Sequence, residues 1–173
     1  GLLYGLKVPD MVATLAKFKG VARRFEVVGS SKQVEVIDDY AANTMKIEAA
    51  IRTAQRRRSH VMAYIQPVGF GPMRMMRADL TRMLADVMRA GDDLVFAPIP
   101  YFGGTVVKDI SSDDLIADIR ALAPHIKIHL AKSRDDFISD VRQKTFNDTT
   151  ILIMGARDPT LSDFAHQVAQ AVA

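Results

Sequence analysis

Two adjacent carboxylates, Asp38 and Asp39, end an apolar run that begins at Val34, and a tyrosine, Tyr40, follows them. A carboxylate at the end of a strand can accept hydrogen bonds from a pair of ligand hydroxyls, such as those of a ribose, or can bind a cation. The plainer alternative is that the two aspartates cap the next helix or are solvated at the strand end. The sequence leaves both interpretations open.

Three further stretches that follow expected strands, residues 66–72, 100–104 and 155–159, carry glycine, proline or acidic residues. Such residues are typical of loops that approach a ligand closely. Neither the phosphate-loop pattern G-x-x-x-x-G-K-[ST] nor the dinucleotide pattern G-x-G-x-x-G occurs in the chain. We therefore expect that this chain cannot hold a nucleoside triphosphate by itself.

Other kinds of chemistry find little support in the sequence. Cysteine is absent, so disulfides and thiol catalysis are excluded. The 4 histidines are dispersed, and we expect no metal site. The net charge is +3, but the one dense basic run, Arg56 to Arg58, lies at the end of an expected helix, where cations are favourable. The chain also has no tryptophan. We therefore do not expect nucleic acid as a partner. No apolar run is long enough for a membrane helix, and we expect a cytoplasmic protein.

Apolar and polar residues alternate in a way that predicts a doubly wound, Rossmann-like α/β domain. Strands and helices follow one another, and near-continuous apolar strands are typical of a mostly parallel sheet with helices on both faces. A helical lead-in over 2–18, with a break at Val8-Pro9-Asp10, comes first, and the strand at Phe25 is interpreted as part of it. The expected strands are 25–29, 34–38, 60–65, 94–99, 127–130 and 150–154, and the expected helices are 43–58, 73–90, 111–122, 133–145 and 161–172. Ligands of such sheets bind at the carboxyl ends of the strands, where the four loops named above begin.

The segments FKGVARRFEVVG (18–29) and VIDDYA (36–41) resemble the C-terminal domain of the Mur ligases. The resemblance is strongest to the members that add L-alanine or recycle murein tripeptide, which read F-x-G-V-x-R-R-F-E and then D-D-Y-A-H-H-P-T-E-I. It continues through AYIQP, DLVFAPI, SSDDL and ILIMGARD. The resemblance implies that residues 20–173 are this domain and that residues 1–19 are the tail of a central ATPase domain or a linker helix, so that the chain is a piece of a longer protein.

The same resemblance implies an ATP-dependent amide ligase of peptidoglycan precursor synthesis or recycling. In the family, an acyl phosphate forms on a UDP-sugar carboxylate and is attacked by the amine of an amino acid or small peptide. ATP and Mg are held mainly by the central domain, so no catalytic residue is expected in this chain. Carried over position by position, the ATP contacts are Arg24, next to Arg23, and Asp39, with Tyr40 beside it and Asp38 as a supporting cap.

The substrate loops depart from the family pattern. Ala42 and Asn43 replace two histidines, Gly69 replaces an arginine, and Arg157 replaces a glycine. We expect Arg157 to supply a substitute cation for the substrate carboxylate. The expected substrate-binding positions are Ala42, Asn43, Gly69, Phe70, Arg157 and Asp158. The alternatives are a catalytically degenerate paralogue or a nucleotide- or small-molecule-binding module with the same fold, and an unrelated flavodoxin-like domain.

Overall fold

A six-stranded sheet with the order β1-β2-β6-β3-β4-β5 forms the centre of the computed structural model, which describes residues 1–173. Only β1 runs antiparallel to its neighbour, and the other four neighbouring pairs are parallel. The strands are β1 (Glu26–Ser30), β2 (Val34–Asp39), β3 (His60–Ile65), β4 (Asp93–Phe96), β5 (Lys127–Leu130) and β6 (Thr149–Met154). The predicted doubly wound, mostly parallel α/β fold is confirmed.

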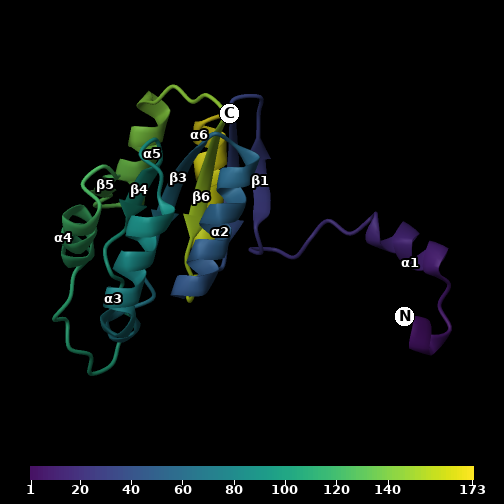
Figure 1. The fold of residues 1–173 in the computed structure, drawn as a ribbon, viewed down its shortest axis with the longest axis horizontal. Helices are drawn as coiled ribbons and strands as arrows, with labels where there is room; N and C mark the ends of the chain where they lie inside the picture. Colours follow the sequence, from purple (N-terminus) through teal and green to yellow (C-terminus); the bar gives the residue numbers. More distant parts are fainter.

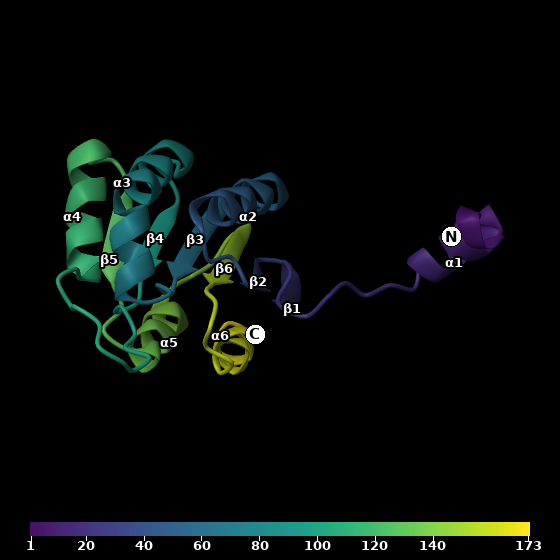
Figure 2. The same ribbon diagram turned by 90° about the horizontal axis from the view of Figure 1, so that it is seen from below.

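Five helices cover the two faces of the sheet. The first three, α2 (Thr44–Arg57), α3 (Phe70–Val87) and α4 (Ser112–Leu122), lie on one face, and α5 (Arg134–Gln143) and α6 (Leu161–Ala171) lie on the other (Figures 1 and 2). Side chains of β2 alternate between the two layers: Ile37 joins the core beneath α2 to α4, and Val36 joins the core beneath α5 and α6. Burial on both faces explains why the strands read as continuous apolar runs. None of the helices is both long and apolar enough to span a lipid bilayer.

The parallel register brings the carboxyl ends of three strands to the same level. Asp39 of β2 pairs with Met154 of β6, which in turn pairs with Ile65 of β3. The amide of Gly155 donates to the carbonyl of Asp39 at 3.2 Å, and the amide of Gln66 donates to the carbonyl of Met154 at 2.8 Å. The loops that follow β2, β3 and β6 therefore start side by side, as the topology rule for parallel sheets predicts.

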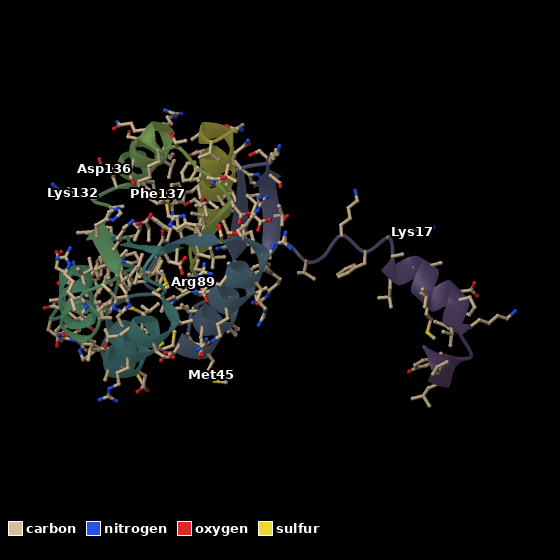
Figure 3. All side chains as sticks on the ribbon, turned by 45° about the horizontal axis from the view of Figure 1, so that its top comes forward. Lys17, Met45, Arg89, Lys132, Asp136 and Phe137 are labelled. Carbon is tan, nitrogen blue, oxygen red and sulfur yellow. The ribbon has the colours of Figure 1, made fainter.

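An arm at the N-terminus stands away from this body. It contains a short 3-10 helix, η1 (Leu2–Tyr4), and α1 (Val8–Leu15), neither of which has a buried residue. Figures 1 and 2 show that an extended segment joins the arm to the sheet. Figure 3 shows Lys17 where α1 meets this segment, far from the sheet. Gly5, with a φ of 72°, ends η1, and Pro9 lies in the first turn of α1, where a missing amide costs nothing.

The structure differs from the prediction most at β1, α3 and β4, and β4 ends at Phe96 rather than at 99. The strand beginning near Phe25 is not part of the lead-in, because β1 pairs with β2 as the antiparallel edge of the sheet. α3 begins at Phe70 rather than at 73, so the stretch VGFGP is a loop only as far as Gly69. Gly69 has a φ of 115°, which favours glycine, and Pro72 is tolerated in the first helical turn.

The basic run at the end of α2 is not simply solvated. Arg57 donates from Nε and Nη2 to the two carboxylate oxygens of Glu35, at 2.9 and 2.7 Å, and Glu35 is only 2% exposed. Arg58 donates to the carbonyls of Ser31 and Lys32 in the β1–β2 turn. A buried carboxylate requires a charged hydrogen-bond partner. Arg57 and Arg58 therefore attach the C-terminal end of α2 to β2 and to the β1–β2 turn.

Candidate functional site

The two aspartates at the end of β2 point to opposite faces, as successive strand residues must. Asp38 is fully buried, and the Nε of Arg23 lies 3.3 Å from one of its carboxylate oxygens. The same guanidinium donates to the carbonyls of Gly155 and Asp158, at 3.0 and 3.2 Å. Asp38 is therefore an internal ion-pair partner, and the expectation that it caps a helix is wrong.

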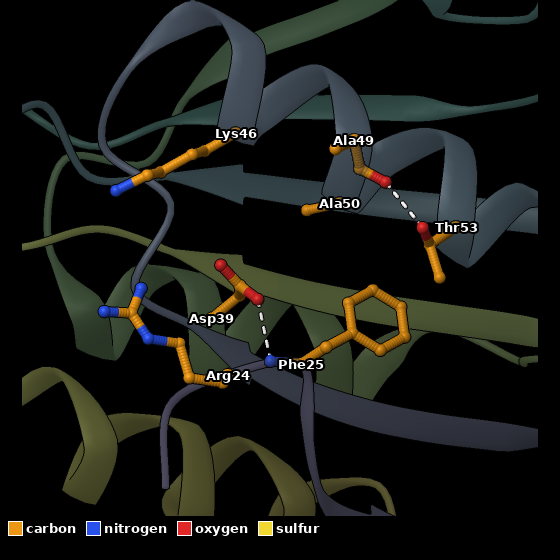
Figure 4. A pocket seen from close by; sticks show the side chains of 7 residues that line it. All are labelled: Arg24, Phe25, Asp39, Lys46, Ala49, Ala50 and Thr53. Carbon is orange, nitrogen blue, oxygen red and sulfur yellow. Dashed lines mark hydrogen bonds between the residues drawn. The ribbon is translucent and has the colours of Figure 1, made fainter. Parts of the chain in front are cut away.

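Asp39 faces a pocket on the side of α2. Its Oδ2 accepts a hydrogen bond from the amide of Phe25 at 2.7 Å, and the other oxygen is directed into the space between Arg24 and Lys46 (Figure 4). Burial raises the pKa of Asp39, against the opposing effects of the amides of Phe25 and Ala41 and the charge of Arg24. The free oxygen can accept hydrogen bonds from a ligand.

The pocket has a polar and an apolar end. Its volume is about 450 Å³. Figure 4 shows the guanidinium of Arg24 and the ammonium of Lys46 on one side of Asp39, and the ring of Phe25 on the other side, beneath α2. The lining residues are Arg24, Phe25, Asp39, Lys46, Ala49, Ala50 and Thr53. Two cations, one hydroxyl acceptor and an aromatic face are suited to a nucleoside phosphate.

The structure divides the two arginines of the RRFE motif between two tasks. Arg24 is exposed and makes no ion pair, and its guanidinium carbon lies 5.4 Å from the centroid of the Tyr40 ring. Arg23 lies 5.0 Å from the same centroid but is already bound to Asp38 and two carbonyls. Arg24 therefore has the free guanidinium, at the position for which a ligand contact is expected.

Asp158 lies at the centre of a hydrogen-bond network. Its Oδ2 accepts from Gln66 at 2.9 Å and from Arg134 at 2.6 Å, and its Oδ1 accepts from the amide and the hydroxyl of Thr160. Burial acts to raise the pKa of Asp158, but the hydrogen bonds from Thr160 and Gln66 and the charge of Arg134 lower it to about 2. Because both oxygens are occupied within the chain, Asp158 fixes the loop after β6.

The remaining predicted substrate positions lie at the same edge of the sheet. Asn43 caps α2, because its Oδ1 accepts from the amide of Lys46 at 3.0 Å, and its amide nitrogen is free. Ala42 and Phe70 are half-buried against the core. Gly69, the N-cap of α3, brings backbone but no side chain to the edge. The structure thus brings these positions together without supplying many side chains for polar contacts.

Arg157 lies against Phe102, a residue of the loop after β4. Its guanidinium carbon lies 5.4 Å from the centroid of the Phe102 ring, and its amide donates to the hydroxyl of Tyr40 at 3.3 Å. Phe102 in turn approaches Gly69, since a Cβ at Gly69 would lie 3.8 Å from its ring. Phe102 lies in the predicted loop 100–104, but no sequence signal marks either Phe102 or Lys46 individually, because each meets the site only through tertiary contacts.

A metal ion finds no ready set of ligands in this chain. The structure gathers no group of three or more His, Cys, Asp or Glu side chains that could hold one. The residues that line the pocket beside Asp39 do not form a Mg²⁺ site of their own.

The fold and its loop-lined edge define a doubly wound α/β domain that presents a pocket at the carboxyl ends of its strands. Residues 23–157 match the family model described as "Mur ligase, glutamate ligase domain". The chain belongs to the Mur ligase family, and it corresponds to the C-terminal, glutamate ligase domain, as the resemblance predicts.

Relatives and solved structures agree with this assignment. A UDP-N-acetylmuramate–L-alanine ligase of Rickettsia bellii is 31% identical over 158 residues, which are 88% of this chain and 32% of that protein. The UDP-N-acetylmuramate-alanine ligase of Thermotoga maritima shares the fold, with a TM-score of 0.71 at 18% identity, over 96% of this chain and 34% of that one. A MurF ligase from Thermotoga maritima, solved with ADP, has a TM-score of 0.60 at 14% identity, over 93% and 34%. The chain thus spans about a third of the length of these relatives.

Proposed function

We propose that the pocket beside Asp39 closes over ATP. The free carboxylate oxygen of Asp39 accepts hydrogen bonds from the two ribose hydroxyls, and Arg24 pairs with a phosphate or stacks on the base, next to Tyr40. Lys46 adds a second positive charge beside Arg24 in the lining of the pocket. The observation that carries the proposal is the Asp39 carboxylate, held by the Phe25 amide on one oxygen and open to the pocket on the other.

The whole protein would be an ATP-dependent carboxylate–amine ligase acting in peptidoglycan precursor synthesis or recycling. A UDP-sugar carboxylate attacks the γ-phosphorus of ATP and releases ADP, and the acyl phosphate is then attacked by the amine of an amino acid or small peptide, releasing phosphate. The name of the Rickettsia bellii relative supports this reaction class. Residues 20–173 would serve as the closing domain. Residues 1–19 would connect it to a preceding domain that holds the phosphate loop and Mg.

The amine substrate would lie at the edge formed by the loops after β2, β3 and β6. Arg157 is the cation available there, since it forms no ion pair within the chain and is exposed. Ala42, Asn43, Gly69 and Phe70 would form the walls through backbone groups, the free amide of Asn43 and apolar surface. Asp158 would act by positioning the Arg157 backbone.

One observation favours the second candidate, a nucleotide- or small-molecule-binding module without ligase activity. Of the six substrate positions, Asp158 has both oxygens bound internally, and Gly69 and Ala42 offer no polar side chain. Few polar groups remain to hold an amine in a reactive geometry. An ATP-dependent ligation assay of the complete protein against amino acids and small peptides separates the two candidates, because the module would bind nucleotide without forming product.

Nucleotide binding can be tested on the chain itself by titrating ADP and recording amide chemical shifts. We expect weak, millimolar binding that shifts the amides around Arg24, Asp39 and Lys46. Asp39→Asn and Arg24→Ala should each weaken it about 10-fold, corresponding to a lost charged hydrogen bond. Asp79→Asn and Arg82→Ala, which change exposed residues on α3, are the matched controls. Shifts that leave the Asp39 pocket unperturbed would refute the proposal.

A further inference from the structure

A second cavity, which we call the amino-edge cavity, lies where the parallel strands begin, at the opposite edge of the sheet from Asp39. Its volume is about 380 Å³. Figure 1 shows the segment after α5 passing close to the C-terminal end of α6 at this edge. Val34 at this edge and Asp39 at the other are the two ends of β2, about 17 Å apart along an extended strand. The residues that give the cavity its chemistry are Ser31, Gln33, Arg142, Lys144, Phe146 and Val172.

Arg142 gives the amino-edge cavity a free guanidinium. It lies in the last turn of α5, is exposed, and forms neither an ion pair nor a side-chain hydrogen bond within the chain. Lys144 lies beside it in the lining, but its ammonium is 3.0 Å from a carboxylate oxygen of Asp140 and 4.0 Å from one of Asp93. The charge of Lys144 is therefore balanced within the chain and that of Arg142 is not, which suits a ligand with a single negative charge.

The other side of the cavity is apolar. Phe146 and Val172 are half-buried and pack against the core beneath α5 and α6, and both also line the cavity. Val34, which is 3% exposed, lines it between them and the sheet. A free cation beside an apolar wall is suited to a ligand that joins an anionic group to an apolar chain.

The walls of the cavity are fixed by hydrogen bonds within the chain. Arg58 donates to the carbonyls of two residues of the β1–β2 turn, Ser31 and Lys32, at 3.1 and 2.9 Å. The amide of Thr149, where the segment after α5 ends, donates to the carbonyl of Gln33 at 2.9 Å. Because the turn and the segment are held together before a ligand arrives, the entropic cost of binding is reduced.

We propose that the amino-edge cavity binds a carboxylate attached to an apolar chain of several carbon atoms. The guanidinium of Arg142 pairs with the carboxylate, and the chain lies against Phe146 and Val172. The cavity shares no lining residue with the pocket beside Asp39. It is thus a separate ligand site, and it can be tested whether or not the chain binds a nucleotide.

A cation at this edge also has a simpler role, because positive charge stabilises the C-terminal end of a helix. Arg56 shows that role without a cavity. It lies in the last turn of α2, is exposed, forms no ion pair, and is not part of the lining. Arg56 and Arg142 are therefore a matched pair: both complement a helix end, and only Arg142 is placed to bind the ligand.

Three small probes separate the two halves of the proposed ligand. Hexanoate has both the carboxylate and the apolar chain, hexanamide lacks the charge, and acetate lacks the chain. Each is titrated into the chain at pH 7 while the amide resonances of Gln33, Arg142, Lys144 and Phe146 are recorded. We expect millimolar binding of hexanoate, and binding about 10-fold weaker for hexanamide, which loses the charged pair, and for acetate, which loses the apolar contact.

Variants at the two arginines test which residue binds the carboxylate. Arg142→Gln should weaken hexanoate binding about 5- to 10-fold and leave hexanamide binding unchanged, because only the charged pair is lost. Arg142→Lys, which keeps the charge, should retain most of the affinity. Arg56→Gln lowers the net charge by the same amount and should leave hexanoate binding unchanged. Both side chains are exposed, so the variants should fold like the parent chain.

Several results would overturn this site. One is a hexanoate affinity that survives Arg142→Gln, and another is an equal loss of affinity in Arg56→Gln. A third is the absence of any shift at the four amides with hexanoate at its limit of solubility. Shifts centred on Arg24 and Lys46 instead would place the carboxylate in the pocket beside Asp39 and would likewise remove the amino-edge site.

Discussion

The Nε of Arg23 lies 3.3 Å from the fully buried carboxylate of Asp38, while the neighbouring residues Arg24 and Asp39 face a pocket. The two Arg–Asp couples come from the same pair of segments. Strand alternation sends Asp38 and Asp39 to opposite faces of the sheet, and Arg23 and Arg24 lie in the turn before β1, where each is near one of them. The first couple binds the loop after β6 through the carbonyls of Gly155 and Asp158. The second leaves a guanidinium and a carboxylate oxygen free for a ligand.

This division predicts opposite effects for two similar substitutions. Arg23→Leu leaves Asp38 buried without its cation and two carbonyls without their donor, so the free energy of unfolding should fall by about 3 kcal/mol. Arg24→Leu removes an exposed side chain and should change that free energy by less than about 0.5 kcal/mol. Urea denaturation of both variants measures the difference. Equal effects would show that the two arginines are not specialised.

Nucleotide binding should depend on pH through Asp39. Burial raises the pKa of this carboxyl, so its charged form, the better hydroxyl acceptor, is lost at a higher pH than for an ordinary aspartate. The affinity for ADP should therefore fall as the pH is lowered through this raised pKa. Asp39→Asn should remove this part of the pH dependence. Titrations at a series of pH values check the prediction, and an identical profile in the variant would contradict it.

The Glu35–Arg57 pair should make stability depend on pH in the acid range. The hydrogen bond from Arg57 lowers the pKa of Glu35 below the ordinary value. The pair therefore stabilises the fold fully above the unfolded-state pKa, about 4.3, and this contribution is lost as the pH falls through the lower folded-state pKa. Glu35→Gln should reduce the free energy of unfolding at pH 7 by about 2 kcal/mol and should flatten its decline below pH ~5.

Gly155 should not tolerate even a methyl group. A Cβ there would lie 2.7 Å from the Cδ2 of Leu161, and 3.1 and 3.2 Å from the Cβ and the carbonyl oxygen of Gln66. Gly155→Ala should therefore cost about 1–3 kcal/mol of stability. Gly71→Ala is the matched control, since nothing lies within 4 Å of its Cβ position and alanine suits a helix. The midpoint of thermal unfolding should be several degrees lower for Gly155→Ala than for Gly71→Ala. An unchanged midpoint in Gly155→Ala would contradict the close packing at Gly155.

The isolated chain should not turn over ATP. Phosphoryl transfer depends on groups that hold the phosphates and Mg²⁺ and that place the attacking and leaving oxygens in line. The chain has neither a phosphate loop nor a cluster of metal ligands. A phosphate-release assay at saturating ATP and Mg²⁺ should give the rate of the buffer alone. Turnover that scales with protein concentration and is lost in Asp39→Asn would show catalytic groups within these residues.

The predicted elements agree with the structure most closely where the apolar pattern is continuous. Strands β3 and β5 have the predicted bounds, and β2 and β6 each differ by one residue. The pattern was least informative at residues 69–72, where glycine and proline are compatible both with a loop and with a first helical turn. The pattern also indicated the strand near Phe25 but placed it outside the β–α repeat, and the structure shows that it pairs with β2 as the antiparallel edge.

The sequence by itself determined the fold class, the family and which loops begin at the carboxyl ends of the strands, because these follow from short-range periodicity and contiguous motifs. Only the tertiary structure decided which member of each adjacent pair is free. Arg23 and Arg24 are chemically alike along the chain, and their tasks differ because carbonyls more than 100 positions away, at Gly155 and Asp158, bind the guanidinium of Arg23 and not that of Arg24. Asp38 and Asp39 differ because Asp38 meets Arg23 and Asp39 lines the pocket beside α2. The same holds for Phe102 and Arg157, whose contact joins two loops that no local pattern relates.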